Sequence, residues 1–223
     1  MTLRLCTVAA ATISLLPFGA AVAEPDTVSR PVLSETDWGG PHLGFGLAWP
    51  RGQNSWRQAS DGLELIPGPW RDETFVIRFG RDWQRGPITY GAGISYGLGS
   101  SIARPQDALF INCSGCATEV GDLVTLTGRI GLAAGRAHVF MTGGWARGSV
   151  IATYFNGILT YADANQEGWT LGLGAEQRIR DGLSLSISYD HIDLGTLAIP
   201  AYLPTGETRI AIDRMQVGMT VRW

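Results

Sequence analysis

Apolar and polar residues alternate with a period of two along most of the chain, the pattern of β-strands with one apolar and one polar face. In the final stretch, residues 215–223, the apolar residues are Met215, Val217, Met219, Val221 and Trp223, and those between them are polar or small. Comparable alternation predicts further strands at residues 38–49, 73–84, 88–98, 122–134, 137–148, 168–179 and 183–193. The chain is therefore expected to be all-β.

The predicted strands are joined alternately by short and long connections. Short turns are expected at residues 85–87, 135–136 and 180–182, and long loops at residues 50–70, 99–121, 149–167 and 195–209. The apolar residues of the third loop leave open an extension of its flanking strands. Short periplasmic turns and long extracellular loops are typical of bacterial outer-membrane barrels. We therefore expect an eight-stranded antiparallel up-and-down transmembrane β-barrel with both chain ends in the periplasm.

Aromatic residues near the predicted strand ends support a membrane location, because interfacial girdles of such residues flank the apolar belt of membrane barrels. The residues assigned to this girdle are Trp38, Trp49, Trp83, Tyr90, Trp145, Trp169 and Trp223. A soluble up-and-down barrel with its apolar face inside has the same periodicity and is the alternative.

Charged residues of the strands fall on the alternate, polar set. They are Arg78, Asp82, Arg129, Glu176, Arg178, Asp190, Arg214 and Arg222. In a narrow membrane barrel they would face the lumen, where an unpaired charge is costly. We therefore expect Arg–carboxylate networks that largely plug the lumen. A narrow porin for small solutes is the alternative.

The N-terminus has the three parts of a secretory signal peptide. Arg4 is followed by an apolar run and by a small-residue cleavage site, so cleavage is expected between Ala23 and Glu24. The predicted organisation is a signal peptide at residues 1–23, a periplasmic lead-in at residues 24–37 and one barrel domain at residues 38–223. A net charge of -3 gives no basic field for a nucleic-acid partner.

The segment Gly168–Gly195 carries a resemblance to a known family. It has a G-x-x-x-G-x-G-x-E strand, a short turn, and a second strand that ends in Asp193-Leu194-Gly195. In this it resembles the small alphaproteobacterial outer-membrane proteins of the Omp25/Omp31 type, within the OmpA-like transmembrane-domain superfamily. The terminal residues Gln216, Gly218, Val221 and Trp223 resemble the signal read by the barrel-assembly machinery.

The resemblance implies a location in the bacterial outer membrane and a role as an envelope structural protein, surface antigen or narrow pore. Expected partners are outer-membrane lipid, lipopolysaccharide and the barrel-assembly machinery, with no cofactor, no metal and a monomeric state. A less favoured alternative is an adhesin that binds through its long loops. Those loops carry the aromatic residues Trp56, Trp70, Phe110, Tyr154, Phe155 and Tyr202.

Two motifs carry other possible chemistry. His191 lies near Ser188, Asp190 and Asp193, which suggests a lipid A-modifying enzyme. Residues three apart on a strand point to opposite faces, however, so we expect no enzyme. Cys113-Ser114-Gly115-Cys116 could be a redox motif or half of a metal site, but in an exported protein it is best interpreted as a disulfide that closes a short loop.

Overall fold

The chain divides into two units, residues 1–32 and 33–223. A computed structural model describes residues 36–58, 68–104, 116–155, 159–199 and 206–223 of the second unit. The predicted signal peptide and its cleavage site lie outside the described residues. Within the described ranges, no helix is long and apolar enough to cross a membrane.

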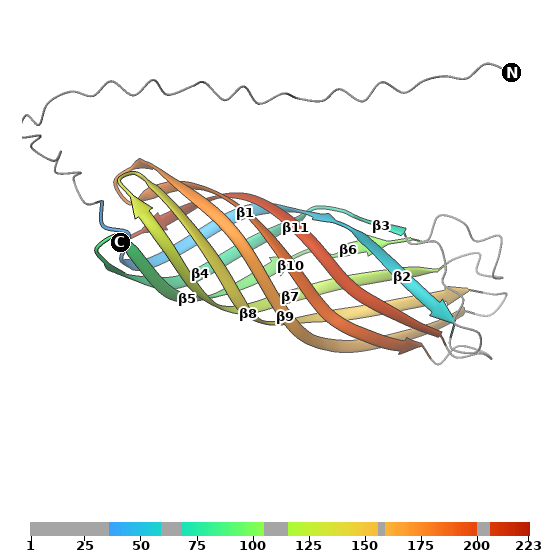
Figure 1. The fold of residues 1–223 in the computed structure, drawn as a ribbon. Coiled ribbons are helices and arrows are strands. Elements are labelled where there is room, and N and C mark those ends of the chain that lie inside the picture. The colour runs from blue at the N-terminus through green and yellow to red at the C-terminus, as the bar shows by residue number, and fades with distance from the viewer. Residues whose placement is uncertain (1–35, 59–67, 105–115, 156–158, 200–205) are drawn as a thin grey trace, which may run out of the picture. The chain divides into compact units, whose positions relative to one another are not determined.

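The described residues form one antiparallel, all-β sheet of eleven strands (Figure 1). The strands are β1 (Gly40–Arg51), β2 (Gln53–Gln58), β3 (Gly68–Arg71), β4 (Thr74–Arg85), β5 (Ile88–Leu98), β6 (Ser101–Ala103), β7 (Ala117–Ala134), β8 (Ala137–Phe155), β9 (Leu159–Arg180), β10 (Leu183–Ile199) and β11 (Gly206–Arg222). The predicted number of eight is therefore not the number of strands observed.

The three additional strands lie in segments that the sequence predicted as long loops. β2 and β3 fall within residues 50–70, and β6 falls within residues 99–121. Each short strand is separated from a longer neighbour by a residue with positive φ, namely Gly52, Asp72 or Gly99. Positive φ is foreign to extended backbone, so it interrupts a strand at these positions.

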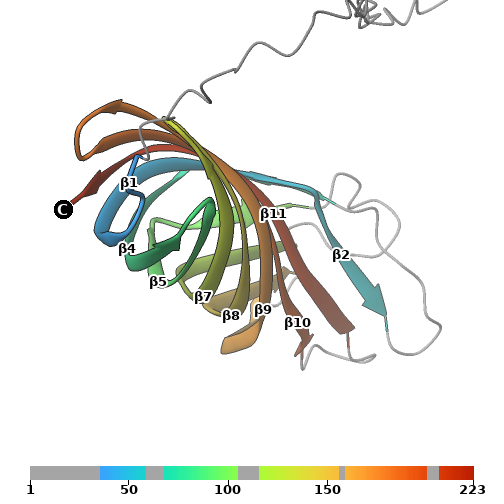
Figure 2. The same ribbon diagram turned by 60° about the vertical axis from the view of Figure 1, so that its left-hand side comes forward.

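The hydrogen-bonded pairing returns to its starting point. It passes from β1 through β4, β5, β7, β8, β9, β10 and β11 and back to β1 (Figure 2). The first and last long strands pair over most of their length, from His42 opposite Arg222 to Arg51 opposite Asp213. The sheet is thus closed and has no free edge between β1 and β11.

The three predicted tight turns are present as two-residue connections. They join β4 to β5, β7 to β8, and β9 to β10. Each contains a glycine with positive φ: Gly86, Gly135 and Gly182. Two-residue hairpin turns need positive φ, which glycine adopts without a steric penalty.

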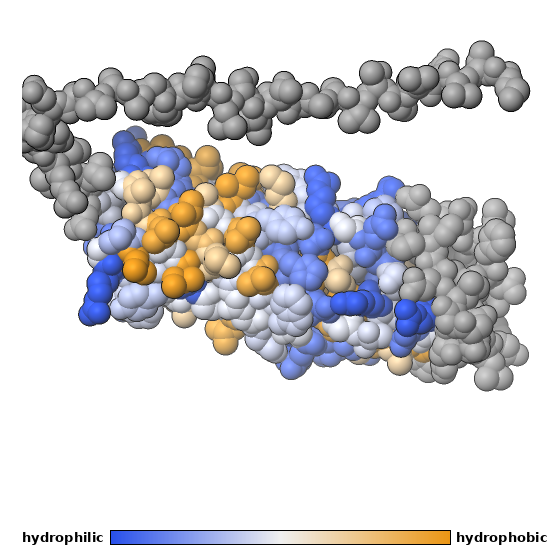
Figure 3. All heavy atoms as spheres, viewed as in Figure 1, coloured by the Kyte–Doolittle hydropathy of each residue, from blue (hydrophilic) through white to orange (hydrophobic). Residues whose placement is uncertain are grey.

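The part of the sheet next to these turns, here called the lower zone, has an apolar outer face and a polar interior. In β10, Leu185, Ile187 and Tyr189 are exposed, whereas the alternate residues Ser186 and Ser188 are buried. The other long strands contribute exposed apolar residues such as Phe79, Ile94, Leu126, Leu173 and Met219. Orange apolar residues accordingly gather towards the turn end in Figure 3.

The remainder of the sheet, here called the upper zone, reverses this polarity. Beyond Asp190 in β10, Ile192 and Leu194 are fully buried and His191 and Asp193 lie outside. Beyond Arg214 in β11, Ile210 and Ile212 are buried in the same way. The resulting apolar core is formed by Trp56, Trp70, Ala103, Cys116, Val120, Ala146, Val150, Ala152, Ile192, Leu194, Leu197, Ile199, Ile210 and Ile212.

Two aromatic residues expected in exposed loops therefore lie in a core. Trp56 and Trp70 are each 4% exposed. The Trp56 indole donates to Asn54 Oδ1 and Thr118 Oγ1, both at 3.0 Å, and the Trp70 indole donates to the Ala211 carbonyl at 2.9 Å. These bonds satisfy the indole donors away from water. Phe110 and Tyr202 lie outside the described residues.

An ion pair on the outside of the upper zone gives a pH-dependent prediction. Burial by itself raises the pKa of the Asp193 carboxyl, but hydrogen bonds from the Gly195 N–H and the Arg209 guanidinium, the latter 3.0 Å away, hold that pKa below its ordinary value. A depressed pKa stabilises the fold above the ordinary carboxyl pKa, and the contribution is lost as the pH falls through the depressed value.

We expect Asp193→Asn to lower the free energy of unfolding by about 0.5 kcal/mol at neutral pH, the size typical of an exposed ion pair. The difference from the unsubstituted protein should vanish at acidic pH. Urea unfolding of both proteins across a pH series measures it. A difference that stays constant down to pH 2 would contradict the assignment.

Candidate functional site: the charged interior of the lower zone

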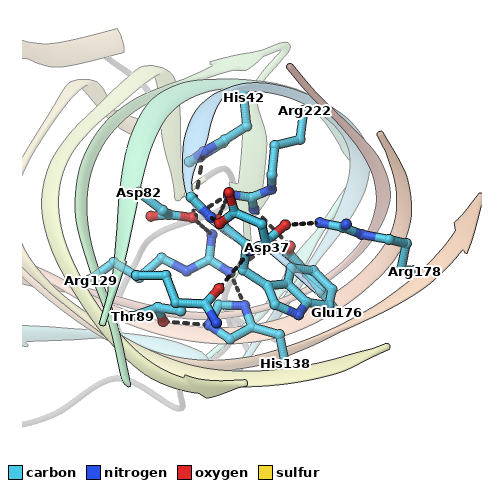
Figure 4. A network of polar contacts seen from close by, with 12 residues as sticks. Asp37, His42, Asp82, Thr89, Arg129, His138, Glu176, Arg178 and Arg222 are labelled. Atoms are coloured by element: carbon cyan, nitrogen blue, oxygen red, sulfur yellow. Dashed lines mark hydrogen bonds and ion pairs between the residues drawn. The ribbon is translucent and has the colours of Figure 1, made fainter. Parts of the chain in front are cut away.

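Two arginines and two carboxylates form a closed ring of ion pairs across the interior of the lower zone (Figure 4). Arg129 lies 2.7 Å from Glu176 and 3.3 Å from Asp82. Arg222 lies 2.9 Å from Asp82 and 3.2 Å from Glu176. The four residues come from β4, β7, β9 and β11, so the ring connects opposite walls. Its charges sum to zero.

Two histidines extend this network. His138 Nδ1 lies 3.2 Å from an Arg129 nitrogen, which can only donate, and His138 Nε2 lies 2.7 Å from Thr89 Oγ1. This geometry fits a neutral imidazole that accepts from Arg129 and donates to Thr89. His42 Nδ1 lies 3.6 Å from Asp82. Both histidines are buried.

Trp38, just before β1, closes the turn end of this network. Its side chain is fully buried, its backbone N–H donates to Gln84 and its indole N–H donates to the Gly135 carbonyl at 3.1 Å. Arg222 donates to its carbonyl oxygen. The Arg178 and Arg222 guanidinium carbons lie 4.7 and 5.6 Å from the centre of its ring. The prediction that Trp38 belongs to an exposed girdle is therefore wrong.

Phe140 forms the wall beside the ring of ion pairs. The Arg129 guanidinium lies 3.5 Å from the centre of its aromatic ring, a favourable cation–π geometry. A Cβ at Gly174, on the neighbouring β9, would collide with this ring, so only glycine leaves room for it. Cation–π contact with Phe140 and Trp38 adds to the ion pairs in holding Arg129 and Arg222.

Further along the interior, towards the upper zone, the charges form separate contacts. Arg214 lies 3.4 Å from Asp190, and Arg78 donates to Gln216 Oε1 at 3.0 Å. A cavity of about 40 Å³, with room for only a few water molecules, lies between these contacts and the ring of ion pairs. The interior is therefore filled by side chains over most of the lower zone.

Comparison with known proteins agrees with this geometry. Residues 10–222 match the family model described as the outer membrane protein beta-barrel domain. The chain belongs to this outer-membrane β-barrel family. It is 28% identical, over 194 residues and 78% of each chain, to the 31 kDa outer-membrane immunogenic protein of Brucella melitensis and to that of Brucella suis. The predicted Omp25/Omp31 resemblance is confirmed.

Solved structures show the same fold. The outer-membrane protein OprG from Pseudomonas aeruginosa superposes with a TM-score of 0.58, over 83% of this chain and 96% of that chain, at 11% sequence identity. This barrel protein is located in the bacterial outer membrane, as predicted. The lower zone, with its apolar outer face, is the part of such a protein that contacts lipid.

The eight charged residues predicted for the lumen of the barrel are not all placed in one network. Asp82, Arg129, Glu176 and Arg222 form the ring, whereas Asp190 and Arg214 form a separate pair. Arg78 contacts the amide of Gln216, and Arg178 donates to the backbone carbonyl of Asp37. The assignment of these residues as a functional plug remains a prediction.

The sequence interpretation missed four members of this site: Trp38, His42, His138 and Phe140. All four are even-numbered, and so are the inward-facing residues of β1 and β8. The parity of each strand was therefore an available signal. Phe140 was noted as an apolar residue on the polar set, and the structure explains it as an interior ring beside Arg129.

The residues of the enzyme alternative are not brought together. Ser188 is buried inside the barrel, whereas His191 lies on the outer face, where its Nδ1 lies 2.7 Å from Asp213 and its ring contacts Trp169. The described residues also contain no group of three or more His, Cys, Asp or Glu side chains suited to a metal ion.

The remaining predicted residues keep their earlier interpretation. Cys113 lies outside the described residues, so its disulfide with the buried Cys116 stays a prediction. Gln216 points inward and Val221 and Trp223 are exposed on the outer face. Gly218 lies so close to the Phe45 carbonyl that a side chain would collide there. Recognition of these terminal residues by the assembly machinery also stays a prediction.

Proposed function

We propose that this protein is a closed structural barrel of the outer membrane, with its lumen plugged and its surface loops raised above the lipid. In this proposal the eleven strands act as eight staves: β1 continues into β2, β3 into β4 and β5 into β6, and each strand from β7 to β11 is one stave. The short turns and both chain ends face the periplasm, and the four long connections face outside.

The single observation that carries the proposal is the filling of the interior in both zones. The ring of Asp82, Arg129, Glu176 and Arg222, closed by Trp38, occupies the lower zone. The apolar core around Ile192, Leu194 and Ile210 occupies the upper zone. An ion would have to displace buried ion pairs and then enter a dry apolar core, and both steps are costly.

The upper zone supports the proposed surface role. Strand β9 has 22 residues, about twice the 9–11 that a tilted strand needs to cross a bilayer. With its apolar interior and polar exterior, the upper zone resembles a small soluble barrel placed on a membrane barrel. Such a stalk holds the long loops away from the membrane. Lipid, lipopolysaccharide and the barrel-assembly machinery are the proposed partners of the monomer, without an enzymatic activity or a cofactor.

Single-channel recording tests the plug directly. Purified monomer inserted in a planar bilayer should give no stable conductance steps above the baseline. A general porin, recorded in the same bilayers, supplies the positive control. Regular conductance steps from the unsubstituted monomer would favour the narrow porin, the alternative suggested by the small cavity between Arg78 and Arg129.

The envelope role needs a second experiment. A strain that lacks the protein should become more sensitive to detergents and bile salts, and expression of the closed barrel should restore resistance. Removing the long surface loops one at a time should leave this restoration intact if the barrel itself is the structural element. Loss of binding to host surfaces without loss of resistance would favour an adhesin.

A further inference from the structure

An apolar groove lies on the outer face of the lower zone, across β5, β7, β8 and β9. Its volume is about 460 Å³, and it is lined by Ile88, Ile130, Gly131, Leu132, Val139, Phe140, Met141, Leu173 and Gly174. The large side chains at its margins, among them Ile130 and Leu173, are more than half exposed. The groove therefore faces lipid.

The groove lies at the turn end of the barrel. Ile88 pairs with Leu132, and Leu132 pairs with Val139, three residues after the β7–β8 turn begins. The Ala133 N–H donates to the Pro87 carbonyl at 2.7 Å and ties this turn to the β4–β5 turn. Headgroups of the leaflet on this side would lie level with the two turns.

Arginine is found at all three short turns. Arg85 ends β4, Arg136 lies in the β7–β8 turn and Arg180 ends β9, and all three are exposed. Asp181 is the acidic residue within these turns. Arg136 donates to the Ile179 carbonyl at 2.7 Å, which holds its guanidinium at the edge of the sheet. The turn end thus offers fixed positive charge next to the groove.

We infer that the groove binds one acyl chain of an anionic phospholipid, and that Arg85 and Arg136 bind its phosphate. The inference rests on the proposed orientation, in which the short turns face the periplasm, so the lipid belongs to the periplasmic leaflet. Hydrocarbon surrounds the barrel in any case, so the groove contributes shape and van der Waals contact rather than a hydrophobic gain. Selectivity for the anionic headgroup then comes from the arginines.

The test uses phosphatidylglycerol and phosphatidylethanolamine in equal amounts in nanodiscs. Protein released from these discs is analysed by native mass spectrometry for retained lipid. The unsubstituted protein should retain mainly one phosphatidylglycerol. The R85Q/R136Q variant should lower the ratio of retained phosphatidylglycerol to phosphatidylethanolamine about fivefold or more. The same substitution at Arg147, an exposed arginine of the upper zone, should not.

A second variant tests the groove itself. Ile130→Trp fills it and should reduce total retained lipid, whereas Leu126→Trp, on the same strand face but outside the groove, should not. Equal retention of the two lipids, or a ratio unchanged in R85Q/R136Q, would overturn the inference, as would retained lipopolysaccharide in place of phospholipid. Conductance of the same preparations keeps the two proposals apart, because a conducting barrel that retains phosphatidylglycerol contradicts only the plug.

Discussion

Replacing Glu176 with glutamine is expected to lower the free energy of unfolding by about 3–5 kcal/mol, the usual cost of breaking a buried ion pair from one side. Glu176 is 2% exposed and accepts from Arg129 at 2.7 Å and from Arg222 at 3.2 Å. Glutamine keeps the shape of the side chain and removes its charge. Asp82 alone then has to balance two buried guanidinium groups.

Urea unfolding in lipid vesicles, followed by tryptophan fluorescence, measures this effect. The matched control is Glu167→Gln in the same strand, because Glu167 is exposed and should change stability by no more than about 0.5 kcal/mol. Equal, small effects of both substitutions would show that the ring of ion pairs contributes little.

A double variant separates the cost of an unbalanced charge from a loss of packing. Combining E176Q with R129M leaves Asp82 paired with Arg222, 2.9 Å away, and restores neutrality inside the lower zone. We therefore expect the double variant to be more stable than E176Q alone, since buried pairs replaced by apolar groups often cost little. Additive losses from the two substitutions would instead indicate that Arg129 acts through its contacts with Phe140 and His138.

The sequence predicted the inward and outward faces of the lower zone because the side-chain period of a strand is two. Ser186, Ser188 and Asp190 of β10 fall on one set, and Leu185 and Ile187 fall on the other. The family hairpin and the repeated short turns then assigned the apolar set to lipid. Parity does not give distances, so which arginine meets which carboxylate required the register and twist of the whole sheet.

The upper zone was not predicted because its residues keep the parity and exchange the polarity. Ile192 and Leu194 follow Asp190 on the inward set, so the apolar set appears to change sides at this point. A register shift between Asp193 and Thr196, beside Gly195 with its positive φ, then moves Leu197 and Ile199 inward. An alternation that first reverses and then shifts by one residue looks like a loop.

Trp38 was misplaced for a related reason. Aromatic residues at strand ends are typical of a membrane girdle, and Trp49, Trp83 and Trp169 on the outer face carry that signal correctly for part of the set. Trp38 has the parity of the inward residue His42, but it lies outside β1. Its burial depends on Arg178 and Arg222, which are far from it in the sequence.

Replacing Trp38 with alanine should therefore lower the free energy of unfolding by about 3–5 kcal/mol, the range for removing a large buried aromatic side chain. The substitution removes the indole bond to Gly135 and the ring between Arg178 and Arg222. Trp38→Phe keeps an apolar ring without the N–H donor and should lose much less. Urea unfolding ranks the variants, with Trp169→Ala as the control because Trp169 is 49% exposed on the outer face.

The same Trp38→Ala variant distinguishes one seal from two. It admits water to the ring of ion pairs from the turn end, but the apolar core around Ile192 and Ile210 still fills the upper zone. We therefore expect Trp38→Ala to remain without stable conductance steps in a planar bilayer while it loses stability. Conductance steps in this variant would show that Trp38 is the only barrier to ions. An unchanged stability would show that its buried contacts do not hold the first strand against the last.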